Sequence, residues 1–357
     1  MNEFIMTSSH SPRVIPATTA ASGFVVTWFA LLLPVLLGFA VLVVDLAHVM
    51  VVRSELQNAA DAAALAGAAK LTSPGATVYN WTNAAIEADA SVGLNKADGG
   101  TPLVKGVIET GWWNVQTGTG LRGVAETPTT YDKPAVRVTI RRSSDVDGLL
   151  NGGPLRLFFA PVFDQNFTDI SVTAVAMISA PGMAEAGTLF PFAVGKCMYD
   201  QFWDVTTNTP KIDPATGAAY VFNFGSIYFS SCLSGEWTTF RTTANDVPSV
   251  RDLITNGNPD PYLLGENTYI QPGVKTTLYD EIPLNKDILV AVIDGVTPGT
   301  HQPIYAFAGI HVDAIVVITG KRYIQGHFIS NSSVPGIGPG PGGGTYYGTY
   351  VPPMMVH

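Results

Sequence analysis

Hydrophobic positions form one uninterrupted run near the N-terminus and short alternating runs after it. Residues 23–44 carry no charged side chain, and at 1.5 Å per residue such a helix covers roughly 30 Å, the hydrocarbon thickness of a bilayer. A cleaved signal peptide would be shorter and would end in a small-residue cleavage site, whereas the nearest such site, residues 64–66 (ALA), lies far downstream. The pattern favours a membrane-spanning helix over a cleaved leader or a buried core helix.

The helical pattern continues past the apolar run. Residues 53–70 are rich in Ala, the strongest helix former, contain no Pro, and have Gly67 as their only Gly. The first terminating sequence is TSPG at 72–75. We therefore predict one rod over residues 23–70, roughly 70 Å long, with Pro34 as the place for a bend.

Two rows of side chains follow the second half of this rod. Polar residues recur every four positions, and small residues form a second row. The small row allows either the close approach of a partner helix or packing of a linker helix on its own domain. The polar row is Arg53, Gln57 and Asp61, and the small row is Ala60, Ala64, Gly67 and Ala68.

Asp45 interrupts the hydrophobic pattern at the end of the apolar run. An acid at this depth either marks the place where the helix emerges into water or makes a specific contact with a partner. The second interpretation predicts that Asp45→Ala lowers assembly with its partner without lowering the amount of protein.

The pattern downstream of the rod predicts a small α+β layer. Residues 76–95 have the periodicity of an amphipathic helix, and strands are expected at 104–115, 135–142 and 170–179. The order of these elements suggests helices covering one face of a sheet. Residues 148–163 fit a short helix or an apolar strand equally well.

A mainly β region is expected after a connector at 180–189. Strand-forming runs lie at 218–231, 288–296 and 306–330, the last being long enough for two strands joined near Ile310 or for one bulged strand. The Gly/Pro/Tyr-rich end of the chain is either a disordered tail or a docking segment that presents Tyr346, Tyr347 and Tyr350.

The expected fold class is therefore α+β, with a long N-terminal transmembrane helix continuing as an Ala-rich rod. A small α+β layer and a mainly β C-terminal domain follow it. The expected divisions are a cytoplasmic segment (1–22), the transmembrane helix and rod (23–71), an α+β domain (72–182), a β-rich domain (183–333) and the tail (334–357).

Charge and cysteine content limit the compartments and the classes of partner that fit this protein. The net charge is −9 with only 19 Lys and Arg, which leaves no basic face for nucleic acid. Cys197 and Cys232 fit one disulfide in an exported domain or two reduced buried thiols. The charges that flank the helix give little information about its orientation in the membrane. The cysteine pair and the Thr/Asn/Gly-rich remainder favour an N-terminus inside the cell and most of the chain outside the membrane.

Catalytic motifs are absent from the sequence, which shows no nucleophile elbow, phosphate loop, dinucleotide fingerprint or zincin helix. His311 and Asp313 would share one face of a strand, and Asp145, Asp147 and Gly148 resemble part of a calcium loop. Each set has too few ligands for a metal. We expect no enzyme activity, no catalytic residue, no cofactor, no metal and no small-molecule substrate.

The segment LPVLLGFAVLVVDLAHVMVVRSELQNAADAAALAGAAKL, residues 33–71, resembles the N-terminal segment of the TadE/TadG-like proteins of the Flp (Tad) pilus assembly system. The shared pattern is an apolar helix with an internal Leu-Pro, an Asp at its outer end, and then LQxAADAAALA. The matching positions are Leu33, Pro34, Asp45, Leu56, Gln57, Ala60, Asp61, Ala62, Ala63, Ala64, Leu65 and Ala66.

The runs GKCMYD, YIQPGVKTTLYD and KRYIQGHF, at 195–200, 269–280 and 321–328, are similar to the C-terminal region of TadG-type members. TadE pseudopilins have a Gly with a Glu five residues later at their processing site. Here Gly23 is the candidate processing position, and Trp28 stands in place of the Glu. TadG members can lack this Glu. The Asp-x-Ser-x-Ser motif of an adhesion domain is absent, so the resemblance implies no metal site.

The resemblance implies a non-enzymatic, single-pass inner-membrane protein with most of its chain in the periplasm. Its partners would be the inner membrane and the Tad pilus assembly proteins or pilin subunits. The alternative hypothesis is a membrane-tethered extracytoplasmic binding protein or hydrolase unrelated to pili.

Overall fold

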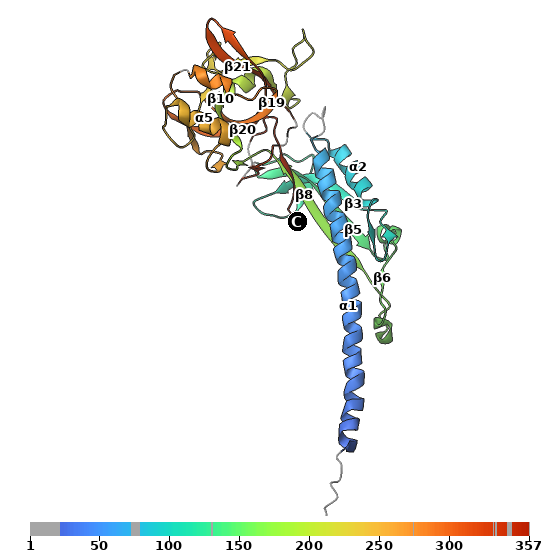
Figure 1. Ribbon diagram of the computed structural model, residues 1–357. Helices are drawn as coiled ribbons and strands as arrows, with labels where there is room; N and C mark the ends of the chain where they lie inside the picture. Colours follow the sequence, from blue (N-terminus) through green and yellow to red (C-terminus); the bar gives the residue numbers. More distant parts are fainter. Residues whose placement is uncertain are drawn as a thin grey trace, which may run out of the picture. The chain divides into compact units, whose positions relative to one another are not determined.

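The computed structural model describes residues 22–72, 79–129, 131–273, 275–330, 332, 334–340 and 345–356 (Figure 1). The predicted cytoplasmic segment, apart from residue 22, lies outside these residues. The chain divides into two compact units. One contains Met1–Met50 and Arg156–Thr168, and the other contains Val51–Leu155 and Asp169–His357.

Helix α1 runs from Ser22 to Lys70 and confirms the predicted rod, ending just before the TSPG sequence. It continues through Pro34. Its apolar side chains between Val25 and Val44 are exposed almost without exception, as lipid-facing side chains must be. Among the described residues, α1 is the one helix long and apolar enough to cross a membrane. It suggests single-pass anchoring.

The first unit also contains a loop at residues 156–168, which we call the aromatic loop. The loop begins in β6 (Leu155–Arg156), forms the short 3-10 helix η1 (Ala160–Phe163) and ends in β7 (Phe167–Thr168), which pairs with β6. Figure 1 shows it beside α1. Residues 148–163 thus form neither of the single elements considered above.

The first sheet of the second unit has five antiparallel strands in the order β23-β8-β5-β3-β4. Helix α2 (Trp81–Val92), capped by the Asn80 side chain, packs on β3 and β5. The three strands expected from the sequence are all present. The strands are β3 (Val107–Asn114), β4 (Leu121–Gly123), β5 (Asp132–Arg142), β8 (Ile170–Ser179) and β23 (Val351–Met355).

The second sheet has seven strands in the order β13-β21-β20-β19-β10-β16, with β18 also paired to β20. It confirms the mainly β character of the C-terminal region. The pairing is antiparallel except between β10 and β19. The strands are β10 (Leu189–Gly195), β13 (Phe222–Phe224), β16 (Gly235–Trp237), β18 (Asn267–Tyr269), β19 (Lys286–Ile293), β20 (His301–Ile318) and β21 (Lys321–Phe328).

Smaller elements connect and cover this sheet. The connector predicted at 180–189 contains β9, the middle strand of a three-stranded sheet in the order β17-β9-β22. The remaining elements are α3 (Val146–Leu150), α4 (Lys196–Phe202), α5 (Val247–Asn256), η2 (Thr276–Asp280), β1 (Lys96–Ala97), β2 (Thr101–Pro102), β9 (Met183–Ala184), β11 (Trp203–Asp204), β12 (Thr209–Pro210), β14 (Tyr228–Phe229), β15 (Cys232–Leu233), β17 (Tyr262–Leu263) and β22 (Ile337–Gly338).

Two sequence predictions about the C-terminal region need correction. The run at 306–330 does form two strands, but β20 passes through Ile310 with a bulge between Val312 and Ala314, and the turn lies at Thr319 and Gly320. Both turn residues have positive φ, 48° and 77°, as a two-residue hairpin turn requires.

The disordered tail is the second wrong prediction, since residues 345–356 pair and pack with the rest of the second unit. Within them, β23 pairs with β8 at the edge of the first sheet. Tyr347 and Tyr350 are buried, with the Tyr347 ring centroid 4.0 Å from that of Tyr199. These tyrosines serve packing and are not presented for adhesive contacts.

Candidate functional site at the end of the apolar helix

The Asp45 carboxylate lies at the end of the apolar half of α1 and accepts hydrogen bonds from three consecutive backbone N–H groups of the aromatic loop. Oδ1 lies 2.7 Å from the Phe158 nitrogen, and Oδ2 lies 3.0 Å from that of Phe159 and 2.7 Å from that of Ala160. The Asp45 residue is only 4% exposed. Asp45 is therefore a buried hydrogen-bond acceptor for another segment of the same chain.

The local sequence explains why the loop needs an acceptor. The first N–H groups of a helix have no partner inside the helix, and an acidic side chain is the usual group that caps them. Ala160 is the first residue of η1 and Pro161, which has no N–H, follows it. Asp45 thus caps η1 from 115 residues away in the sequence. The ring of Phe158 also lies 4.9 Å from that of His48 on α1.

The small-residue row lies in the second unit, where it faces the chain's own α2 and β5. Ala60, Ala64 and Ala68 are fully buried. A Cβ on Gly67 would lie 2.9 Å from both the carbonyl oxygen of Ala84 and the Cβ of Ala88 on α2. The row therefore allows α1 and α2 to approach closely, as packing on its own domain requires. Leu56, from the same motif, is also fully buried.

The polar row has mixed environments. Gln57 donates to Asp61 Oδ1 at 2.7 Å and to the carbonyl oxygen of Thr173 on β8 at 3.3 Å. These bonds fix the Gln57 amide between its own helix and the sheet. Arg53 is exposed on the same stretch of α1.

The structure places the other predicted positions apart from this site. Gly23 is the second residue of α1, and Trp28, five residues later, is exposed. Cys197 on α4 and Cys232 on β15 form a disulfide with their Cα atoms 6.0 Å apart, which confirms the predicted bond. The bond closes a segment that contains β13, a strand of the second sheet.

The polar pairs considered as metal ligands form contacts within the protein. Asp145 caps α3 by accepting from the Gly148 N–H at 2.7 Å. His311 contacts Asp287 at 2.7 Å, and His327 contacts Asp313 at 2.9 Å. Within the described ranges, no three metal-binding side chains are grouped to hold an ion.

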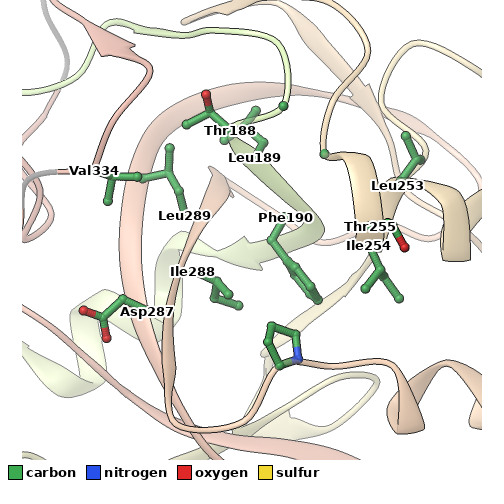
Figure 2. A pocket seen from close by; sticks show the side chains of 13 residues that line it. Thr188, Leu189, Phe190, Leu253, Ile254, Thr255, Asp287, Ile288, Leu289 and Val334 are labelled. Atoms are coloured by element: carbon green, nitrogen blue, oxygen red, sulfur yellow. The ribbon is translucent and has the colours of Figure 1, made fainter.

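A separate pocket in the second unit has a volume of about 220 Å³. It lies between β19, α5 and the start of β10, and Figure 2 shows Phe190, Ile254 and Ile288 among its apolar side chains. Among the described residues that line the pocket, Asp287 is the only titratable one, and it is already paired with His311. This pocket gives no catalytic arrangement.

A buried acid lies on β16, at the edge of the second sheet. Glu236 on β16 is 4% exposed, and its carboxylate accepts a hydrogen bond from the Ser226 hydroxyl. Burial raises the pKa of Glu236 to about 7. No sequence signal marked this residue, because an isolated Glu beside a Trp looks like an ordinary surface position.

Sequence reasoning also missed the loop that partners Asp45. A combined signal was available, because an acid at the end of an apolar helix needs a donor and the run LFFAPVF at 157–163 is unusually aromatic for a connection. Nothing in either pattern pairs the two segments.

Two protein-family models match the N-terminal part of the sequence. The Tad family model, which describes Flp pilus-assembly TadE/G-like proteins, matches residues 23–70, and the Tad_C model, which describes Tad-like Flp pilus-assembly proteins, matches residues 66–176. No curated protein and no solved structure gave a match. The two ranges include Asp45, the aromatic loop and the small-residue row. Residues 23–176 of the chain are therefore similar to the TadE/G-like Flp pilus-assembly proteins.

Proposed function

We propose that the protein is a TadG-type, non-enzymatic component of the Flp pilus assembly and adherence machinery. It is anchored in the inner membrane by the apolar half of α1, and most of its chain lies in the periplasm. There it contacts pilus subunits or the assembly complex.

The observation that carries the proposal is the Tad motif folded as one helix. Its apolar half exposes hydrocarbon side chains over the length of a bilayer, and its Ala-rich half is buried against the protein's own sheet. A protein built this way is attached to the membrane and carries a folded region on the same helix. The runs at 195–200, 269–280 and 321–328 support the TadG branch, and the similarity to pilus-assembly families suggests a non-enzymatic role.

The disulfide supports the periplasmic location. Disulfides form and persist in oxidising compartments, and the Cys197–Cys232 bond lies in the region that follows the membrane helix. A reporter that is active only in the periplasm, fused to the C-terminus, should be active. An inactive reporter on a full-length, membrane-inserted fusion would contradict this orientation.

Deletion of the gene in its host, followed by complementation, tests the proposed function. We expect surface pili, counted by electron microscopy, and surface attachment to fall in the deletion strain and to return with the wild-type gene. Pili of normal number and length in the deletion strain would refute a role in assembly and favour an independent envelope binding protein.

Processing at Gly23 is a separate question for the same strain. The Trp28 side chain replaces the acid found in pseudopilins, so we expect the N-terminus to be intact. Mass spectrometry of the membrane-extracted protein distinguishes this result from a chain cut after Gly23.

A further inference from the structure

The aromatic loop exposes large apolar side chains beside the membrane helix. Val162 is 81% exposed and Phe163 is 72% exposed, and Phe158, Phe159 and Phe167 are also exposed. Soluble surfaces rarely gather so many exposed aromatic side chains in one short loop. The loop needs an apolar environment outside the protein.

The position of the loop identifies that environment. Asp45 fixes the loop to α1 where the apolar run ends, and Val25 lies 20 residues earlier on the same helix. Twenty residues of helix span roughly 30 Å. If the hydrocarbon core begins near Val25, its other boundary lies near Asp45, and the loop is at the level of the lipid head groups.

Many backbone N–H groups of the loop are hydrogen-bonded, as a position in the membrane interface requires. Unsatisfied N–H groups are costly in a bilayer. Here Asp45 accepts from the Phe158, Phe159 and Ala160 nitrogens. Four further backbone bonds lie inside the loop, from the N–H groups of Leu157, Val162, Asp164 and Gln165 to the carbonyl oxygens of Asn166, Phe159, Pro161 and Ala160, respectively.

The charge pattern also fits a shallow position. Arg156, at the start of the loop, and Asp164 are the only charged residues of the loop, and both are exposed. A carboxylate is excluded from hydrocarbon but tolerated among head groups, where Phe and Val side chains can reach the ends of the acyl chains.

We propose that the aromatic loop inserts into the outer interface of the membrane and forms a second lipid contact beside α1, fixed at its depth by Asp45. This inference rests on the membrane anchor in the proposed function, but not on any role in pilus assembly. A protein partner that covers the same side chains is the competing occupant.

Fluorescence quenching by lipids tests the inference on the full-length protein in nanodiscs. Because both native cysteines are in the disulfide, a cysteine introduced by Val162→Cys can be labelled with bimane. Val205→Cys is the matched control, since Val205 is 76% exposed on the β11–β12 turn. Leu36→Cys reports on α1. The quencher is a phosphatidylcholine with a nitroxide near the top of its acyl chain.

We expect the label at position 162 to be quenched several times more strongly than the label at position 205. Equal quenching at 162 and 205, with strong quenching at 36, would overturn the lipid contact while leaving the anchor intact, and would favour a protein occupant. Absence of quenching at 36 as well as 162 would overturn both the anchor and this inference. Pilus counts test the assembly role separately.

Discussion

Replacement of Asp45 by Ala should release the aromatic loop from α1. The change removes the acceptor of three backbone N–H groups, at 2.7, 3.0 and 2.7 Å. A lost helix cap costs about 1 kcal/mol, and each buried donor without a partner costs about 1–3 kcal/mol. Because the proposed position of the loop is the water-facing edge of the membrane, the freed N–H groups can still reach water. We therefore expect the free energy of opening the loop to fall by a middle value of about 3 kcal/mol. This equals roughly a hundredfold shift in the local opening equilibrium.

Hydrogen exchange followed by mass spectrometry measures this opening. Peptides covering residues 156–168 should exchange roughly a hundredfold faster in Asp45→Ala, whereas peptides from β20 should be unchanged. Asp45→Asn keeps one acceptor oxygen and should give a smaller increase. Asp164→Asn is the control, because it removes an exposed charge from the same loop at a position with φ of 60°, which Asn tolerates. Unchanged exchange of the loop in Asp45→Ala would refute the capping role.

Three further predictions concern the second unit and use the detergent-solubilised full-length protein. Gly67→Ala should lower the free energy of unfolding by about 1–3 kcal/mol, because its new methyl group meets α2. Gly38→Ala is the control, because a Cβ at this position has no neighbour within 4 Å, and it should leave the melting temperature unchanged. Equal effects of the two substitutions would contradict close helix packing. In the unfolded chain the Glu236 carboxyl loses its proton near pH 4.5, whereas in the folded protein its pKa is about 7. Stability should therefore fall by about 3 kcal/mol as the pH rises across that window, and urea titrations at several pH values should show that Glu236→Gln removes this fall. An identical pH dependence in the variant would show that other groups cause it. Cys197→Ser combined with Cys232→Ser should cost about 3–4 kcal/mol, the value for a closed loop of this length, and a reductant should lower the melting temperature of the wild type but not of the double variant.

The long helix and the central strands were predictable because each carries its own local signal. The rod combines an apolar run with Ala-rich periodicity. The strands β3, β5 and β8 alternate or consist of branched residues, as expected for a sheet covered on one face. Their predicted ends differ from the observed ends by three residues or fewer.

The aromatic loop was not predictable because its structure depends on one distant carboxylate. Residues 157–163 have no periodicity of their own, and the acceptor for their N–H groups lies more than a hundred residues earlier. The strand β23 was missed for a different reason. Its sequence contains Pro352 and Pro353, which argue against a central strand, but β23 lies at the edge of the sheet, where Pro is tolerated.

The pairing of β23 with β8 also imposes an order on folding. The two strands are separated in the sequence by the entire second sheet. Until residues 351–355 have been made and exported, the outer edge of β8 has no neighbour and can pair with another extended chain. A shortened chain would therefore carry an open strand edge into the cell envelope, where it is a site for aggregation or for recognition by quality-control proteases.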